Sequence, residues 1–405
     1  MYALLGGTRV IEASSFVASP SAGLYLAQMG AEVIRVDQLG GGPDFRRWPK
    51  ADNGASLYWE GLNKGKKSVA LDLGRPEGRE LLAALATAPG DRAGLFLTNF
   101  PVDGFLSHEK LQQRRADLIT TRIMGLANGG PALDYTVNSA LGIPQITGPE
   151  SLGDEPVNHV LPAWDLLTGA YAAFAMLAAL QHRQATGRGQ EVRIPLADVG
   201  IATIANLGQL AEVITTGDNR ARYGNSVYGA FGRDFVTADR VRLMIMAITP
   251  RQWTGLVTAL NLAAPVAEIE ATRGVSFAKD EGVRFEHRDA LFPLVEAAVA
   301  LRQSDELGAM FDQLGCCWGS YQTMREAAHD AALVGENPVF STIKQTSGLS
   351  YPVPGAMATI PEEPRLPPVR APFLGEHSDE VLAEVLGLGS GQIGALHDAG
   401  LVANA

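Results

Sequence analysis

The stretch Thr8-Arg9-Val10-Ile11-Glu12, followed by residues 21–29 and then by Glu32-Val33-Ile34-Arg35-Val36, decides the fold class. The two outer runs are rich in Val and Ile, which favour β-strands, and the middle run is apolar, reads as a helix and is closed by Gly30. Two strands joined by a helix form a βαβ unit with parallel strands. The amino-terminal part of the chain is therefore predicted to be α/β.

Strands and helices continue to alternate beyond this unit. Further short apolar runs and helical segments are predicted at 68–71, 76–86, 94–97, 106–115, 118–123 and 191–194. This alternation predicts a Rossmann-like large domain, with a mostly parallel sheet covered by helices on both faces.

The remainder of the chain is expected to add a second domain. A long helix is predicted from Asp165 to about His182, and further helix at 198–215. From Tyr223 the composition shifts to Gly, Tyr, Phe and Asn, which indicates a smaller α+β domain. The predicted division is a large domain at 1–215, a small domain at 223–330 and a return segment at 331–405 that completes the large domain, with Ser378 as the cap of a closing helix.

Charge and hydropathy exclude several kinds of partner. The formal net charge is −11, and no basic run stands out, which argues against nucleic acid and anionic membrane surfaces. The longest strongly apolar stretch, 169–180, is shorter than the ~20 residues that span a bilayer. The start shows no basic region or cleavage pattern of a secretory signal. We expect a cytoplasmic protein with no membrane anchor.

The two cysteines, Cys316 and Cys317, are neighbours in the sequence. Adjacent cysteines provide neither the spaced ligand pairs of a zinc site nor an easy disulfide. We expect them to be buried as small hydrophobic side chains, in a protein without a structural metal.

Familiar nucleotide and hydrolase motifs are absent. The turn after the first strand reads Ala13-Ser14-Ser15-Phe16-Val17 and lacks the glycines of a dinucleotide-binding fingerprint. No G-x-S-x-G elbow, P-loop or H-E-x-x-H helix occurs. The usual nicotinamide and flavin oxidoreductases are therefore disfavoured.

Asp165 is the most informative single position, because it stands between Pro162-Ala163-Trp164 and the long apolar helix. An aspartate at or next to the first residue of a helix is most simply a cap. The same position would let backbone N–H groups and the helix dipole stabilise an ionised carboxylate, which is what a carboxylate nucleophile needs. Both interpretations stand on the residues alone.

Several segments, in order along nearly the whole chain, resemble class III coenzyme A (CoA) transferases, the family of formyl-CoA transferase and carnitine-CoA transferases. The segments that carry the resemblance are 7–12, 26–37, 62–68, 98–100, 178–180, 186–190 and 374–380. The resemblance implies that Asp165 is the nucleophile, which attacks an acyl-CoA thioester to give an anhydride and then an aspartyl-CoA thioester. It also implies an interlocked homodimer, an acyl-CoA substrate, and no cofactor beyond the CoA of that substrate.

The resemblance further implies a CoA site along the strand ends. The implied contacts are Phe16, Val17, Ala18, Gln38, Leu71, Arg75, Asn99, Phe100 and Tyr135. Gln38 departs from the family, where an arginine commonly stacks on adenine. Basic side chains that suit the phosphates or the substrate are Arg46, Arg47, Lys66 and Lys67.

The flanking runs at 61–66, 158–165 and 223–235 resemble a narrower group, the 2-methylfumaryl-CoA isomerases or mesaconyl-CoA C1–C4 CoA transferases. In that group CoA moves between the two carboxyl groups of one dicarboxylic acid. The segment 223–233, with Tyr223, Asn225 and Arg233, would then be a lid, and Arg233 a partner of the free carboxylate. A turn-rich connection to the small domain is the simpler interpretation of the same residues.

Three other functions compete with this one. An intermolecular CoA transferase would use two different acids, and a non-catalytic acyl-CoA-binding protein would keep the fold without the chemistry. A racemase of the same fold would need a histidine base in the loop at 132–138, which has none. Proton abstraction next to the thioester is therefore disfavoured.

Overall fold

The computed structural model describes residues 1–404, which form two compact units. Unit 1 comprises Met1–Leu141, His159–Thr216 and the segment from Ala331 onward, and unit 2 comprises Gly142–Asn158 and Gly217–Asp330.

The short segment Gly142–Asn158 packs with unit 2, whereas the sequence had placed it in the large domain. The guanidinium of Arg222 is the reason, because it donates hydrogen bonds to the backbone carbonyls of Thr147, Gly153 and Glu155. Such long-range contacts leave no periodic pattern in a sequence.

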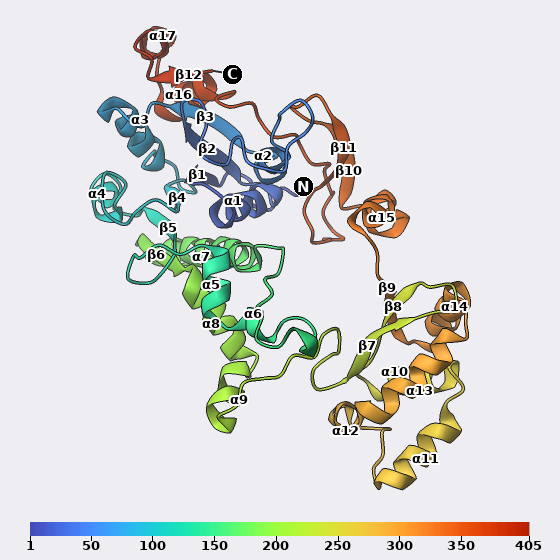
Figure 1. Ribbon diagram of the computed structural model, residues 1–405. Helices are drawn as coiled ribbons and strands as arrows, with labels where there is room; N and C mark the ends of the chain where they lie inside the picture. Colours follow the sequence, from blue (N-terminus) through green and yellow to red (C-terminus); the bar gives the residue numbers. More distant parts are fainter. Residues whose placement is uncertain (405) are drawn as a thin grey trace. The chain divides into compact units, whose positions relative to one another are not determined.

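Unit 1 is built on a seven-stranded sheet with the order β12-β3-β2-β1-β4-β5-β6. Its strands are β1 (Arg9–Ala13), β2 (Glu32–Gln38), β3 (Lys67–Leu71), β4 (Leu95–Thr98), β5 (Ile119–Met124), β6 (Gln190–Pro195) and β12 (Val402–Ala403). Neighbouring strands are parallel except β12, which pairs antiparallel with β3. The predicted mostly parallel α/β sheet is confirmed (Figure 1).

Helices cover both faces of this sheet (Figure 1). One face carries α1 (Ala18–Gln28) and α7 (Ala163–Thr186); the other carries α3 (Pro76–Ala86), α4 (His108–Gln112), α16 (Ser378–Leu386) and α17 (Ser390–Asp398). Successive strand residues face opposite sides, so Val10 enters the core under α1 while Ile11 enters the core under α3. The sheet is thus buried on both faces, as its continuous apolar strands require.

Helix α7 packs directly against α1. A Cβ atom at Gly169 would lie 2.6 Å from the carbonyl oxygen of Ala18, so the close approach depends on glycine. By length and composition α7 would suffice to cross a membrane. Its buried face, which includes Ala172, Met176 and Leu180, instead packs in one hydrophobic core with α1 and the sheet. Helix α7 is therefore an interior helix of unit 1.

The remaining elements of unit 1 are shorter. They are α2 (Leu57–Asn63), α5 (Asp134–Ala140), α8 (Leu196–Asn206), α9 (Gln209–Thr216), the π-helical turn η2 (Ala331–Gly335) and the antiparallel hairpin of β10 (Phe340–Lys344) and β11 (Ser350–Pro354).

Unit 2 combines an antiparallel sheet with helices, an α+β arrangement. Its strands, in the order β7-β8-β9, are β7 (Phe231–Val236), β8 (Arg242–Ala247) and β9 (Cys317–Ser320). Its helices are α6 (Ile143–Ile146), η1 (Glu150–Leu152), α10 (Pro250–Ala259), α11 (Ala263–Arg273), α12 (Glu281–Glu286), α13 (Arg288–Ala300), α14 (Ser304–Leu314) and α15 (Met324–His329). An aromatic core that includes Phe231, Trp253 and Phe292 holds the layers together.

Two helix boundaries differ from the prediction. Helix α1 begins at Ala18 and not near residue 21, because Pro20 lies in the first turn, where no backbone N–H is needed. The helical region expected at 198–215 is divided into α8 and α9 at Gly208, whose φ is 78°.

Two side-chain predictions were wrong. Ser378 does not cap α16, because the cap residue is His377. The buried hydroxyl of Ser378 instead accepts a hydrogen bond from the Ala70 N–H and lies 2.9 Å from the Ala403 carbonyl oxygen. Cys317 is exposed on β9, and only Cys316 is partly buried. Whether the Ser378 and Cys317 side chains are buried depends on which distant segments of the chain pack against them, and local sequence does not show this.

Candidate active site

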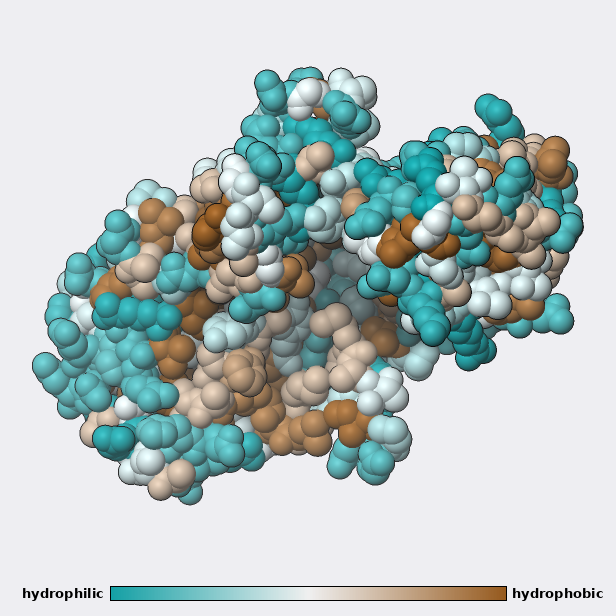
Figure 2. All heavy atoms as spheres, turned by 90° about the horizontal axis from the view of Figure 1, so that it is seen from below, coloured by the Kyte–Doolittle hydropathy of each residue, from teal (hydrophilic) through white to brown (hydrophobic). Residues whose placement is uncertain are grey.

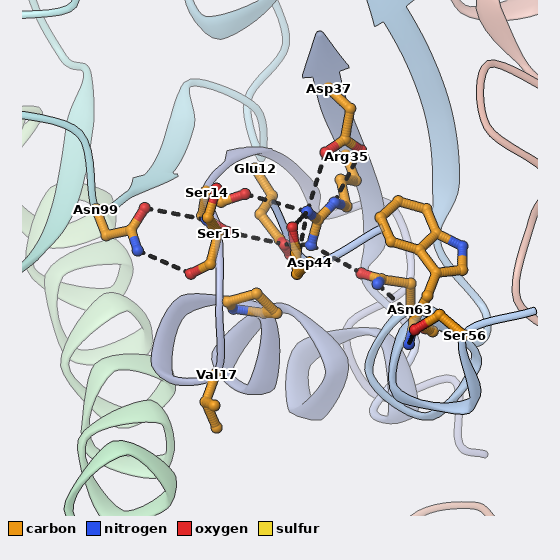
Figure 3. Close-up of polar contacts among 12 residues, drawn as sticks. Glu12, Ser14, Ser15, Val17, Arg35, Asp37, Asp44, Ser56, Asn63 and Asn99 are labelled. Carbon is orange, nitrogen blue, oxygen red and sulfur yellow. Dashed lines mark hydrogen bonds and ion pairs between the residues drawn. The ribbon is translucent and has the colours of Figure 1, made fainter. Parts of the chain in front are cut away.

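The strand order of the sheet reverses between β1 and β4, since β2 and β3 follow on one side of β1 and β5 and β6 on the far side of β4. The carboxyl ends of β1 and β4 therefore mark a topological switch point. Ligands of open α/β sheets bind at such a point. Here the Asn99 side chain accepts from the Ser15 N–H at 3.1 Å and donates to the Ser15 carbonyl at 2.8 Å. These bonds fix the loop after β1 to the end of β4 (Figure 3).

Beside this loop lies a buried charge cluster around Arg35, whose guanidinium donates to the Ser14 carbonyl (Figure 3). Its guanidinium contacts Asp37 and Asp44 at 2.9 Å each and Glu12 at 3.4 Å. All four side chains are buried, and the Trp59 ring covers the guanidinium at 4.6 Å. Charges survive such burial only when they are paired and hydrogen-bonded, and the carboxylates hold the pKa of Arg35 above its ordinary value despite the burial.

Lys66 completes the charge cluster, although the sequence pointed to it as a phosphate contact. Its ammonium donates to Glu12 at 2.8 Å, to the Pro20 carbonyl at 2.9 Å and to Asn63 at 3.1 Å. Burial lowers the pKa of Lys66 to about 8, against the opposing charge of Glu12. Its three N–H donors meet acceptors inside the protein, so none is left for a phosphate.

The segment between β2 and α2 is anchored to this cluster through Asp44 and presents Arg47 beside the loop after β1. The Ser56 hydroxyl donates to the Arg47 carbonyl at 2.6 Å. The Arg47 guanidinium carbon lies 5.3 Å from the ring centroid of Phe16 and 5.5 Å from that of Tyr58. Phe16 has a φ of 70°, a left-handed conformation that is uncommon for residues other than glycine and clusters at functional sites.

Helix α7 begins at Ala163, and Asp165 is its third residue. The backbone N–H groups of Trp164 and Asp165 both donate to one oxygen of Asp134, at 2.8 and 3.0 Å. The Trp164 indole also donates to Asn138 at 3.1 Å. Asp134, which precedes α7 by some thirty residues and is only 3% exposed, therefore caps the helix in place of Asp165.

The charge state of Asp165 follows from this arrangement. Burial, and after it the charge of Asp134, raise the pKa of Asp165 to about 7, and the charge of Arg47 opposes the shift. The sequence had predicted that the helix N–H groups would stabilise the ionised form, and this was wrong because Asp134 accepts from them. A poorly solvated carboxyl group that titrates near neutral pH, and is ionised above it, suits nucleophilic attack.

The predicted CoA contacts follow the ends of neighbouring strands. Phe16, Val17 and Ala18 follow β1, Gln38 ends β2, Leu71 ends β3, and Asn99 and Phe100 follow β4. The carboxyl ends of parallel strands share one edge of the sheet, so these positions lie along a single edge. Asn99 and Phe100 also line a cavity of about 760 Å³, a size that small-molecule sites commonly have.

Some of these side chains already have partners within the protein. Leu71 is fully buried in the core, which leaves only its backbone for a ligand. Arg75 donates to the Ala399 carbonyl at 2.7 Å, and the Tyr135 hydroxyl donates to the Val160 carbonyl at 3.1 Å.

The other basic candidates differ in their surroundings. Lys67 pairs with Glu32 at 2.8 Å and with Glu380 at 2.7 Å. Arg46 is exposed and lines a second cavity, of about 420 Å³, next to Lys50. Arg46 is thus open to a ligand, whereas Lys67 is held by carboxylates.

The residues of the predicted lid lie in unit 2. Arg233 is part of β7 and pairs with Glu296 at 2.8 Å, and Asn225 bonds to the carboxylate of Asp234. Tyr223 packs in a cluster of aromatic rings. The predicted lid segment therefore ends inside a strand.

Sequence reasoning missed Asp134, Tyr58 and the cluster around Arg35. Charged residues inside apolar strands, such as Glu12 and Arg35, were the available signal for a buried ion cluster. Asp134 gave no comparable signal, because its partners lie thirty residues further along the chain. Among residues 1–404, no group of three or more His, Cys, Asp or Glu side chains is placed to hold a metal ion.

Comparison with known proteins assigns the chain to a family. A model of CoA-transferase family III matches residues 5–378. The chain therefore belongs to CoA-transferase family III, and the family expected from the sequence is confirmed.

Individual relatives cover the chain almost completely. It is 47% identical over 405 residues to 2-methylfumaryl-CoA isomerase of Chloroflexus aurantiacus, covering 100% of this chain and 98% of that protein. It is 30% identical to succinyl-CoA–D-citramalate CoA-transferase of the same organism, covering 95% and 94%. A solved CAIB/BAIF family protein from Brucella suis superposes with a TM-score of 0.76 at 26% identity, covering 95% of this chain and 100% of that one.

Replacing Arg35 by Leu should destabilise the protein by about 3–5 kcal/mol, because buried carboxylates lose their counter-charge. The free energy of unfolding in urea measures this loss. Arg9→Leu is the matched control: the Arg9–Glu32 pair joins the same two strands but is partly exposed, and should contribute less than about 1 kcal/mol. Equal losses in the two variants would contradict the assigned importance of the cluster.

Replacing Asp134 by Asn should shift the pH dependence of CoA transfer. Asn keeps an oxygen that can cap α7 but removes the charge that raises the pKa of Asp165, so the acid limb of kcat/KM should move to lower pH by about one unit. Activity on the alkaline plateau should stay within a few-fold of wild type. Asp305→Asn, an exposed change in unit 2, is the control, and an unmoved acid limb in Asp134→Asn would refute the coupling.

Proposed function

We propose that this chain converts 2-methylfumaryl-CoA to 3-methylfumaryl-CoA by moving CoA between the two carboxyl groups of one dicarboxylic acid. The observation that carries the proposal is the 47% identity, over the full length of the chain, to a relative named 2-methylfumaryl-CoA isomerase. Membership of CoA-transferase family III supports the same class of chemistry.

Asp165 is the nucleophile of the proposed reaction. Its carboxylate attacks the thioester carbon, the C–S bond breaks, and an anhydride and CoA thiolate form. The thiolate then attacks the Asp165 carbonyl, which gives an aspartyl-CoA thioester and releases the acid as a carboxylate. The other carboxylate of the same acid attacks that thioester, and the two steps run in reverse with no net change in protons.

The raised pKa of Asp165 fits this role. A poorly hydrated carboxylate reacts more readily, because little water must be removed from it before it attacks. Burial beside Asp134 keeps the Asp165 carboxylate poorly hydrated. Helix α7 fixes the position of the nucleophile through its first turn, because Asp134 holds the backbone of Asp165 itself.

CoA is proposed to lie along the carboxyl edge of the sheet, from the loop after β1 to the cavity beside Asn99 and Phe100. Of the basic candidates for its phosphates, Lys66 and Lys67 pair with carboxylates, whereas Arg46 and Arg47 are exposed, and Arg46 is the proposed phosphate contact. Gln38 is at the exposed end of β2, where it would contact the adenine.

A homodimer and a cytoplasmic location complete the proposal. Apolar residues gather on the face of the molecule that carries α7 to α9 (Figure 2). Exposed large apolar side chains on these helices and on the turn between α8 and α9 are Leu167, Tyr171, Phe174, Ile201, Leu207, Leu210 and Ile214. An exposed apolar patch of this kind marks an interaction surface, and a second copy of the chain is the proposed partner.

The proposed reaction is tested with 2-methylfumaryl-CoA as the sole substrate of the purified protein. Wild type should form 3-methylfumaryl-CoA, seen by chromatography, and Asp165→Ala should fold normally yet lose activity by at least about 10³-fold. In wild type, hydroxylamine should attack the aspartyl-CoA thioester, release CoA and leave a hydroxamate at Asp165, and Asp165→Ala should form no such hydroxamate. Activity of Asp165→Ala within a few-fold of wild type would exclude the mechanism.

Labelled free 2-methylfumarate tests whether transfer stays within one molecule. The label should enter the product far more slowly than isomerisation proceeds, because the released acid remains bound until it reacts again. Rapid incorporation of label would favour an intermolecular transferase, the activity named for the relative that is 30% identical.

A further inference from the structure

Arg47 is a cation near Asp165 without a counter-ion of its own. Among the described residues 1–404, no side chain or carbonyl accepts a hydrogen bond or ion pair from its guanidinium, and the side chain is exposed. Arg9, Arg35, Arg75, Arg115, Arg122 and Arg233 of the same chain all pair with a carboxylate. The five N–H donors of Arg47 are therefore open to a ligand.

The guanidinium is nevertheless held in one place. Phe16 and Tyr58 flank it at 5.3 and 5.5 Å, and stacking on aromatic rings leaves the edge of the guanidinium plane open for a carboxylate. Its backbone is fixed by the Ser56 hydroxyl, and Asp44, three residues earlier, is bound to Arg35 in the buried cluster. Arg47 is thus positioned before any ligand arrives, which lowers the entropic cost of binding.

Arg47 is electrostatically coupled to the nucleophile. Its charge opposes the rise in the pKa of Asp165, and both Arg47 and Asp165 act on the hydroxyl of Tyr58. That hydroxyl is buried and has no hydrogen-bond partner among the described residues. A guanidinium and an unpartnered hydroxyl are therefore both within electrostatic range of Asp165.

The proposed reaction requires a site for a second carboxylate. While one carboxyl group of 2-methylfumarate is joined to CoA or to Asp165, the other is a free anion next to a carboxylate nucleophile. Arg233, which the sequence suggested for this role, already pairs with Glu296 in unit 2. Arg47 has the right charge, open donors and coupling to Asp165.

We infer that Arg47 binds the free carboxylate of the acyl group, and so selects thioesters of dicarboxylic acids over those of monocarboxylic acids. The inference rests on the proposed function. After CoA has moved to Asp165, the released acid rotates end over end between Arg47 and the aspartyl thioester. Each of its carboxylates therefore occupies the position at Arg47 in turn. Retention of the acid at Arg47 is what keeps the transfer within one molecule.

The test measures binding in the Asp165→Ala background, where ligands bind without reacting. Three ligands are compared by calorimetry: 2-methylfumaryl-CoA, tiglyl-CoA, in which a methyl group replaces the free carboxylate, and CoA alone. Arg47→Gln should weaken the binding of 2-methylfumaryl-CoA about 10- to 100-fold. The dissociation constants of tiglyl-CoA and CoA should stay within about threefold of their values without this substitution. Arg47→Lys should recover part of the loss, because a point charge replaces the planar fork.

Matched variants separate Arg47 from its alternatives. The variants Arg46→Gln, at the exposed neighbouring position, and Arg233→Gln should change the affinities for 2-methylfumaryl-CoA and tiglyl-CoA by the same factor. Equal weakening of all three ligands by Arg47→Gln would make Arg47 a CoA contact and overturn the inference, as would no weakening at all. If wild type fails to isomerise 2-methylfumaryl-CoA while Arg47 still discriminates, the proposed reaction is rejected and the carboxylate site is retained.

Discussion

The burial of Arg35 against Glu12, Asp37 and Asp44 is the constraint on which the site depends. This one guanidinium joins two strands of the central sheet to the segment that follows β2, and so decides where that segment runs. A surface ion pair could not do this, because water and salt would compete for it. Hydrophobic packing would give the sheet equal stability but would not specify the path of a polar loop.

The second constraint is the capping of α7 by Asp134. The sequence had suggested that Asp165 both caps this helix and acts as a nucleophile. Asp134 takes the capping role at α7, and Asp165 is left with a carboxylate that neither water nor the helix fully stabilises. A capping carboxylate is held ionised by N–H donors and is a weak nucleophile. Because Asp134 takes the cap, the backbone of Asp165 is fixed while those N–H groups leave its side chain free, as the proposed nucleophilic role requires.

What the sequence could predict follows from the range of the interactions involved. The parallel sheet and the long helix carrying Asp165 rest on local periodicity and were anticipated, as was the family through an ordered set of short motifs. The capping role of Asp134 and the burial of Lys66 depend on residues that meet only in the folded chain. From the sequence, Lys66 was a candidate phosphate contact, and its burial was not anticipated because lysine is seldom fully buried.

The two constraints meet at Arg47. Asp44 of the charge cluster anchors the segment that carries Arg47, Asp134 caps the helix that carries Asp165, and the rings of Phe16 and Tyr58 flank the Arg47 guanidinium. An Arg47–Asp165 pair would lower the pKa of the nucleophile and occupy the donors. Exchange between the two ends of one dicarboxylic acid requires a nucleophile and a receptor for the free carboxylate, and these are the roles proposed for Asp165 and Arg47.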